Sequence, residues 1–257
     1  MARFVRCPAF RLSVASDTLK RGHQASNRFR QYCKMNFQTP AEVRAVTFDV
    51  GGTLIKPWPS VGHVYAEVAA KHGRVIQPAV LDQRFRKAWR ELKNFNHARE
   101  EWTALVDQTF AGLVESPPSK TFFSELYDRF SEPGAWHVFE DVKPALEALS
   151  ARGINLAIIS NWDERLRPLL DKLELSKYFA TIAISCEVGF PKPSPVIFEQ
   201  ASRMLRLAPQ HILHIGDSAE QDVAGATAAG YQARLLERGP GESRPGVVRS
   251  LWELENL

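Results

Sequence analysis

The sequence predicts an α/β protein whose core is a doubly wound parallel sheet, with a helical cap inserted near the start of that core. Short β-prone runs alternate with helical stretches from about residue 135 onward, which is typical of parallel strands joined by right-handed crossovers. Residues 57–134 show helical periodicity only, which indicates the cap. The length of 257 residues can accommodate both parts.

Five β-prone runs are predicted as strands of the sheet. The first, Arg44–Asp49, ends before Gly51 and Gly52, so Asp49 lies at the carboxyl end of a buried strand. The later runs are Ile154–Ser160, Ala180–Ile184, His211–Ile215 and Tyr231–Leu236. Because ligands of open parallel sheets bind at the carboxyl ends of the strands, the residues that follow these runs are the candidates for a site.

Helical stretches with recognisable ends separate the strands of the core. One begins at Val142 and closes at Gly153. Another covers Pro195–Leu205, where Ser194 can act as N-cap and proline suits the first turn. These ends support the alternation of strand and helix.

The insert has the pattern of amphipathic helices. Val64–Ala70 and Leu81–Leu92 place charged residues on one side and apolar residues on the other. We therefore expect a core made of residues 43–56 and 135–257, and a cap made of residues 57–134.

Positive charge is concentrated at the N-terminal end. The formal net charge is +4, but residues 1–42 carry eight Lys or Arg against Asp17 and Glu42, which is +6, so the rest of the chain carries −2. The core is not basic, and we expect no nucleic-acid partner. No run of eighteen apolar residues occurs, so we expect no membrane-spanning helix.

The basic segment, residues 1–42, is predicted to lie outside the folded core. The Arg-rich and Ser-containing composition of residues 1–34 fits an organelle transit peptide. A solvated tail, or a start codon placed upstream of a true start at Met35, are the alternatives. We expect a cytoplasmic protein, or a mitochondrial or plastid one if residues 1–34 are a transit peptide.

Four short segments with polar side chains fall at the ends of predicted strands. They are Asp49-Val-Gly-Gly-Thr53, Ser160-Asn161, Gly189-Phe-Pro-Lys192-Pro193 and Gly216-Asp217-Ser-Ala-Glu-Gln-Asp222. Parallel topology brings them together. They supply carboxylates, a hydroxyl and an ammonium, which serve phosphoryl transfer as nucleophile, ligands of a divalent cation and donors to phosphoryl oxygens.

In this order, the four segments resemble motifs I to IV of the haloacid dehalogenase superfamily. The likeness covers about residues 44–236, and the insert lies where that family has a helical cap. Finer matches, such as Val64-Tyr-Ala-Glu67 and Ser160-Asn-Trp-Asp163, are similar to one branch of the family. The resemblance implies a Rossmann-like core and a Mg²⁺-dependent hydrolase, with a small phosphorylated metabolite as substrate.

The resemblance also implies which residues form the catalytic and metal site. Asp49 would be the nucleophile that forms a covalent aspartyl intermediate, and it would also bind Mg²⁺. Asp217 would be a second direct ligand, and Asp222 a ligand that acts through water or through its neighbours. The backbone carbonyl of Gly51 would complete the set.

The phosphate-binding residues follow from the same resemblance. Ser160 would donate to a phosphoryl oxygen, and Lys192 would place a positive charge there. Asn161 and Thr53 are expected on the substrate side, with Thr53 steadying the loop after Asp49 by a hydrogen bond.

Gly51 departs from the pattern of the family. Phosphatases of this superfamily usually carry a second Asp at this position, which protonates the leaving group and then activates water. Such a group contributes roughly 10²- to 10⁴-fold in rate. Three interpretations stay open: a slow phosphatase, an enzyme for substrates with good leaving groups, or a catalytically weak protein that binds or senses a phosphorylated ligand.

Three other activities are less well supported by the sequence. Dehalogenase members of the family carry Tyr at this position and need no metal, whereas the retained Asp217 and Asp222 favour Mg²⁺ chemistry. A phosphonatase would need a buried lysine in the cap, and nothing marks one. A dinucleotide-dependent oxidoreductase would need a Gly-x-Gly-x-x-Gly turn after a strand, which this sequence lacks.

Overall fold

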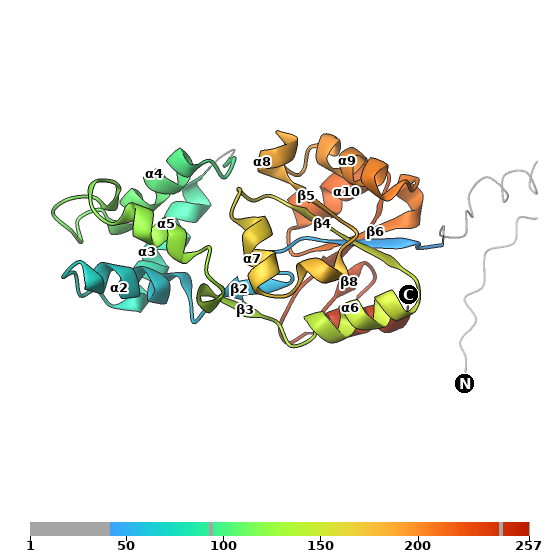
Figure 1. Ribbon diagram of the computed structural model, residues 1–257, viewed down its shortest axis with the longest axis horizontal. Coiled ribbons are helices and arrows are strands. Elements are labelled where there is room, and N and C mark those ends of the chain that lie inside the picture. Colours follow the sequence, from blue (N-terminus) through green and yellow to red (C-terminus); the bar gives the residue numbers. More distant parts are fainter. Residues whose placement is uncertain (1–41, 93–94, 242–243, 257) are drawn as a thin grey trace, which may run out of the picture. The chain divides into compact units, whose positions relative to one another are not determined.

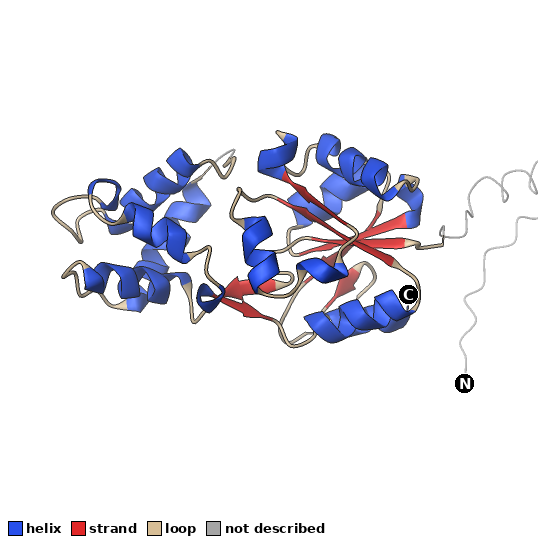
Figure 2. Cartoon of the chain, viewed as in Figure 1, coloured by secondary structure: helices blue, strands red, loops and turns tan. Residues whose placement is uncertain are grey.

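Six parallel strands form the central sheet in the order β5-β4-β1-β6-β7-β8, with helices on both faces (Figures 1 and 2). Their bounds are β1 Ala45–Phe48, β4 Asn155–Ser160, β5 Thr181–Ile184, β6 Ile212–Gly216, β7 Gln232–Leu236 and β8 Val247–Val248. The five predicted strands are all present, and this confirms the predicted doubly wound α/β core. The two residues of β8 are too few to show a strand period in the sequence.

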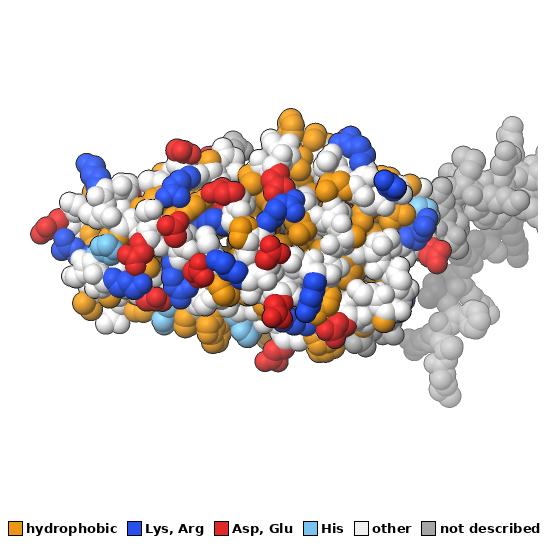
Figure 3. All heavy atoms as spheres, in the orientation of Figure 1, with side chains coloured by type: hydrophobic (Ala, Val, Ile, Leu, Met, Phe, Trp, Pro, Cys, Tyr) orange, Lys and Arg blue, Asp and Glu red, His pale blue; other side chains and the backbone are white. Residues whose placement is uncertain are grey.

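The computed structural model describes residues 42–92, 95–241 and 244–256. The expectations for the basic segment therefore lie, apart from Glu42, outside the described residues. None of the helices in the described part of the chain combines the length and the apolar character that crossing a bilayer requires. On the face drawn in Figure 3, acidic and basic side chains are interspersed.

Side chains along β1 alternate between two hydrophobic layers. Val46 and Phe48 pack in the layer that contains α6 and α7, whereas Ala45 packs in the layer that contains α9 and α10. The bounds are α6 Val142–Ala151, α7 Leu166–Lys172, α8 Ser185–Val188, α9 Pro195–Leu205 and α10 Gly225–Ala228. Alternate residues of a strand face opposite sides of the sheet, so β1 is covered on both sides and its carboxyl end is the part open to a ligand.

Helix α9 has the ends that the sequence predicts. The Ser194 hydroxyl accepts a hydrogen bond from the backbone N–H of Val196 at 3.4 Å, and Pro195 occupies the first turn. The helix ends before Arg206, which adopts the left-handed conformation. Lys192 lies three residues before the start of this helix, in the loop that follows α8.

Four helices lie in sequence between two short antiparallel strands. The strands are β2 Ile55–Pro57 and β3 Trp136–Val138, and the helices are α2 Val61–Lys71, α3 Pro78–Glu91, α4 Arg99–Phe110 and α5 Phe123–Arg129. The helices share a hydrophobic core of their own, in which Tyr65, Leu81 and Phe110 are buried. The β2–β3 pair joins this helical layer to the sheet through two strands (Figure 1).

Asp141 ties the C-terminal segment to the start of α6. One oxygen of its carboxylate accepts hydrogen bonds from Arg238 Nη1 at 2.9 Å, from the Ser250 hydroxyl at 2.7 Å and from the Leu251 backbone N–H at 2.8 Å. Burial alone raises the pKa of Asp141, but the hydrogen bonds from Arg238 and Ser250 outweigh it and hold the pKa below its usual value. The contact therefore favours a charged carboxylate inside the fold.

Candidate functional site

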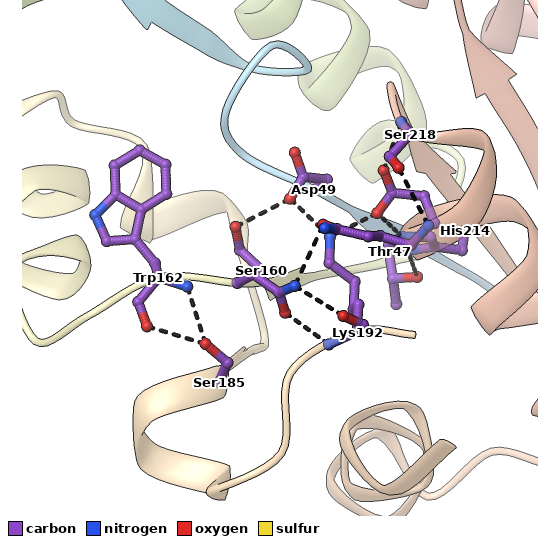
Figure 4. Close-up of polar contacts among 11 residues, drawn as sticks. Thr47, Asp49, Ser160, Trp162, Ser185, Lys192, His214 and Ser218 are labelled. Atoms are coloured by element: carbon purple, nitrogen blue, oxygen red, sulfur yellow. Dashed lines mark hydrogen bonds and ion pairs between the residues drawn. The ribbon is translucent and has the colours of Figure 1, made fainter. Parts of the chain in front are cut away.

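Asp49 lies directly beyond the carboxyl end of β1, where the sequence places it. Its backbone N–H donates to Ile215 of β6 at 2.9 Å, which fixes the main chain at the sheet edge. Its Oδ1 accepts a hydrogen bond from the Ser160 hydroxyl at 3.0 Å and an ion pair from Lys192 Nζ at 2.7 Å (Figure 4). The side chain is buried. Three of the predicted site residues, from three different strand ends, thus meet at one oxygen atom.

Lys192 bridges two carboxylates. Its Nζ lies 2.7 Å from Asp49 Oδ1 and 2.6 Å from Asp222 Oδ1, and the side chain is buried. Burial alone would lower the pKa of Lys192, but the charges of Asp49 and Asp222 raise it above its usual value. The ammonium therefore stays charged at neutral pH and can place a positive charge beside an incoming anion.

Asn161 holds the loop that carries Lys192. Its Oδ1 accepts from the Lys192 backbone N–H at 2.6 Å, and its Nδ2 donates to the Lys192 carbonyl at 3.0 Å and to Gln221 Oε1 at 3.3 Å. The amide is engaged at both ends by these contacts. Asn161 lines the cavity, but the structure uses its amide to position Lys192.

Asp222 is held by a buried network that sequence reasoning did not identify. His214, on β6, lies with Nε2 3.1 Å from Asp222 Oδ1 and with Nδ1 2.9 Å from the Thr47 hydroxyl. Burial lowers the pKa of His214, so a neutral ring can donate from Nε2 while Nδ1 accepts from Thr47. The only signal in the sequence is a polar residue inside the apolar run Ile212–Ile215, and a lone strand histidine does not indicate which residue it contacts.

Asp49, Asp217 and Asp222 form a cluster that could hold a cation. One carboxylate oxygen from each lies within 4.8 Å of the others. Burial, followed by repulsion from Asp49 and Asp222, raises the pKa of Asp217 to about 7. Burial also raises the pKa of Asp49. The cluster therefore holds more negative charge than Lys192 balances, and its oxygen donors suit a hard divalent cation such as Mg²⁺.

Asp222 is the most heavily engaged of the three carboxylates. Its Oδ1 accepts from Lys192 and lies beside His214, and its Oδ2 accepts from the Ser218 backbone N–H at 2.9 Å. Burial raises its pKa, but the Lys192 charge and the His214 hydrogen bond outweigh that effect and hold the pKa well below the usual value. With both oxygens occupied, Asp222 is suited to orient water or neighbouring ligands of a cation.

Two glycines of the predicted motifs make room for these carboxylates. A Cβ on Gly52 would overlap the Asp217 carboxylate, and the backbone of Gly52 has φ +78°. A Cβ on Gly216 would overlap the Asp222 carboxylate. The glycines of the first and fourth segments are thus needed by the packing of the acidic cluster.

Trp162 packs beside Gly51. An added Cβ on Gly51 would lie 3.3 Å from Cζ3 of the Trp162 ring, which is tighter than ordinary contact. The ring packs against Trp136 at 5.2 Å between centroids, and the backbone N–H of Trp162 donates to the Ser185 hydroxyl at 3.1 Å. The Trp162 ring would therefore have to shift by a few tenths of an ångström to admit a side chain at position 51. The predicted role of the Gly51 carbonyl as a cation ligand stays a prediction.

Thr53 does not take the expected position. Its side chain is completely buried, it is not among the residues that line the cavity, and its hydroxyl has no hydrogen-bond partner among the described residues. The loop is held instead through the Thr53 carbonyl, which accepts from Arg238 Nη2 at 2.7 Å. The expected hydrogen bond of the Thr53 side chain is therefore not found among the described residues, and its predicted contact with substrate stays a prediction.

A cavity of about 1160 Å³ opens over Asp49. Asp49, Lys192 and Asp217 line it on the side of the sheet, and residues of the insert, such as Trp89 of α3 and Phe95 of the connection to α4, line it opposite. This volume is somewhat larger than the usual range of ligand pockets, roughly 300–1,000 Å³. The space can hold a phosphate together with a larger organic group.

The family model of haloacid dehalogenase-like hydrolases matches residues 43–230. The chain belongs to the haloacid dehalogenase-like hydrolases. This confirms the resemblance on which the motif assignments rest, and the family is one of hydrolases that includes phosphatases.

Two of the relatives indicate to which members of the family this chain is similar. Haloacid dehalogenase-like hydrolase domain-containing protein 3 of Homo sapiens is 34% identical, over 84% of this chain and 90% of its own length. Phosphoglycolate phosphatase 1 of Pseudomonas aeruginosa is 28% identical, over 79% of this chain and 72% of its own. The branch indicated by the finer sequence matches is thereby confirmed.

Solved structures share the fold. A HAD phosphatase from Thermococcus onnurineus has a TM-score of 0.61 at 26% identity, covering 83% of this chain and 97% of its own. The putative HAD-hydrolase YfnB of Bacillus subtilis, in a form bound to magnesium, has a TM-score of 0.68 at 21% identity, covering 84% and 98%. At that identity, the second likeness bears on the fold alone.

Proposed function

We propose that this chain is a Mg²⁺-dependent phosphatase of a small phosphorylated substrate, acting through a phosphorylated Asp49. The observation that carries the proposal is the convergence of Ser160 and Lys192 on Asp49 Oδ1 beside the acidic cluster. The phosphatases among the relatives support the same reaction class. We also propose residues 57–134 as the cap and residues 43–56 and 135–257 as the core.

The residues of the site suit two successive displacements at phosphorus. An oxygen of Asp49 attacks the phosphorus, the bond to the ester oxygen breaks, and the leaving group departs with the electron pair. Water then attacks the aspartyl phosphate, the bond to Asp49 breaks, and inorganic phosphate leaves. Lys192 and Ser160 would donate to the equatorial oxygens in both steps.

A divalent cation would be held by Asp49 and Asp217, with Asp222 in support, and would supply positive charge at the reacting oxygens. The residues themselves fit this purpose because the pKa of Asp217 is raised to about 7 by burial and by the other two carboxylates. A bound cation would relieve that repulsion.

A binding or regulatory protein is the second candidate, and the Gly51–Trp162 contact is the observation that favours it. Gly51 supplies no carboxylate at the position where phosphatases of the family usually have their general acid, and the Trp162 ring leaves little space for a larger side chain there. Such a protein would bind Mg²⁺ and a phosphorylated ligand without releasing phosphate.

A phosphate-release screen over phosphorylated metabolites, run with and without Mg²⁺, tests the proposal. Turnover that requires Mg²⁺ and is lost in Asp49→Asn would support it, together with acid-stable label on the wild-type protein after brief exposure to ³²P-substrate. Phosphate release that Asp49→Asn leaves intact would refute the nucleophile. Ligand binding without release on any substrate would favour the regulatory protein.

A further inference from the structure

Four aromatic side chains of the inserted helices line the cavity opposite Asp49. We call them the aromatic wall: Trp89 of α3, Trp102 of α4, and Phe95 and His97 from the connection between these helices. Trp89 stacks on Trp102 at 5.9 Å with an interplanar angle of 24°, and Phe95 meets Trp102 edge-on at 4.8 Å. His97 packs edge-on against Phe95 at 4.8 Å. Trp89 is 41% exposed, so ring surface stays available to a ligand.

The described side chains of the wall offer ring surface to a ligand. Among the described residues of the inserted helices that line the cavity, none is Lys, Arg, Asp or Glu. Burial lowers the pKa of His97 to about 4, so this side chain is neutral at pH 7. Trp102 uses its Nε1–H on Asp163 Oδ2 at 2.9 Å. Recognition on this side therefore depends on contact with ring faces and edges.

On the core side, the described residues next to the wall include Arg165, which is already paired. Arg165 also lines the cavity, but its guanidinium is paired with the Asp163 carboxylate at 2.6 Å and donates to the Tyr127 carbonyl at 2.8 Å. Lys192 is the cation that lies at Asp49. A substrate with one phosphate and one planar group matches the described residues of the cavity.

Gly51 independently restricts the leaving group. Glycine has no side chain, so position 51 supplies no acid to protonate the departing oxygen. A phenolic oxygen, with a pKa of roughly 10, leaves without protonation far more readily than an alkoxide, whose conjugate acid resembles water with a pKa of roughly 16. The site thus favours an ester in which the oxygen is attached directly to a ring.

We propose that the substrate is an aryl or heteroaryl phosphate monoester, with its ring packed against the aromatic wall and its phosphate at Asp49. The inference rests on the proposed phosphatase function and specifies its substrate class. In the first displacement the bond from phosphorus to the aryl oxygen breaks, the aryl oxide keeps the electron pair and takes a proton from water, and phosphate stays on Asp49. Water is the only further reactant that hydrolysis of the acyl phosphate on Asp49 requires.

Three probe substrates separate stacking from leaving-group chemistry. Benzyl phosphate and cyclohexylmethyl phosphate share an alcohol leaving group and differ in the planarity of the ring, whereas phenyl phosphate adds the better leaving oxygen. With Mg²⁺ present, we expect kcat/KM to favour benzyl over cyclohexylmethyl phosphate by about tenfold, since aromatic pairs contribute up to this factor. Phenyl phosphate should be better again, mainly through kcat.

Substitutions in the wall test the contact itself. Trp89→Leu and Phe95→Leu should each reduce the preference for benzyl over cyclohexylmethyl phosphate at least threefold. Trp252→Leu is the matched control, because Trp252 is 46% exposed and does not line the cavity. Circular dichroism and thermal unfolding of each variant show whether the fold is kept. Two wall variants are used so that the test can still be made if one of them does not fold.

The possible outcomes distinguish a failure of the proposed substrate class from a failure of the proposed phosphatase function. Equal kcat/KM for benzyl and cyclohexylmethyl phosphate, or a benzyl preference that survives in both folded wall variants, overturns the substrate class while leaving the phosphatase intact. Absence of phosphate release and of labelled Asp49 with every probe overturns the phosphatase proposal and this inference with it. A benzyl preference that only the wall variants lose supports it.

Discussion

Replacing Gly51 by aspartate should restore efficient turnover of alkyl phosphates only when the Trp162 ring is also made smaller. A Cβ at position 51 would lie 3.3 Å from Cζ3 of Trp162, and the carboxylate extends further. The backbone of Trp162 is held by Ser185 at 3.1 Å, so the ring rather than the main chain has to move. Overpacking of this kind costs roughly 1–3 kcal/mol.

The expected magnitudes follow from these two effects. In Gly51→Asp alone, we expect a loss of stability of roughly 1–3 kcal/mol and little gain in rate. In Gly51→Asp/Trp162→Phe, in which the bicyclic indole is replaced by the smaller phenyl ring, a working general acid should raise kcat on benzyl phosphate by roughly 10²-fold or more. The gain on phenyl phosphate should be much smaller, because that leaving oxygen needs less protonation.

Phosphate release from benzyl and phenyl phosphate, measured for six proteins, provides the assay. Gly51→Asp is compared with Gly51→Asn, which has the same size and cannot transfer a proton, and each is made with Trp162 and with Trp162→Phe. The wild type and Trp162→Phe alone complete the set. If Asp and Asn at position 51 give the same rates in both backgrounds while Asp49 is still phosphorylated, the missing acid is not what limits this protein.

Three further changes have direct readouts. Asp49→Asn should abolish labelling by ³²P-substrate, and any retained label would place the nucleophile elsewhere. Asp141→Asn should lower the free energy of unfolding in urea by roughly 2 kcal/mol at pH 7. The difference should become progressively smaller below about pH 4, because the depressed pKa of Asp141 stabilises the fold at pH values above the ordinary pKa of 3.8, and this contribution is lost as the pH falls. A pH-independent difference would contradict this. With the pKa of Asp217 raised to about 7, protons compete with Mg²⁺ below that pH, and calorimetry should show Mg²⁺ affinity falling by up to roughly tenfold per pH unit from pH 7 to 5; a constant affinity would argue against Asp217 as a ligand.

The sequence predicts the sheet and the meeting of Asp49, Ser160, Lys192 and Asp222, because each lies at the end of a strand or in the segment that follows it, and parallel topology places those segments on one edge of the sheet. Local signals, such as Ser194 before Pro195, also predict where α9 begins. The strands, the helix ends and the position of each motif depend on residues that are neighbours in the chain. They can therefore be predicted from the sequence without knowledge of tertiary contacts.

The features that the sequence does not predict depend on distant pairs. Strands β2 and β3 are three residues each and lie on either side of the inserted helices, so neither shows a period. His214 reaches Asp222 only because β6 is followed by a turn that brings the carboxylate back over Gly216. The orientation of the Thr53 hydroxyl into the protein is likewise set by packing, which a motif does not report.

The aromatic wall and the phosphate site are linked through one loop. Asp163 lies three residues after Ser160, and it accepts from Trp102 Nε1 at 2.9 Å and pairs with Arg165 at 2.6 Å. The neighbouring Glu164 accepts from the Tyr127 hydroxyl at 3.0 Å. The loop that places the Ser160 hydroxyl on Asp49 therefore also holds α4 and α5 of the proposed cap. The position of the ring-binding surface relative to the nucleophile is set by these contacts, so changes at Asp163 should alter kcat and ring preference together, whereas changes at Trp89 act on preference alone.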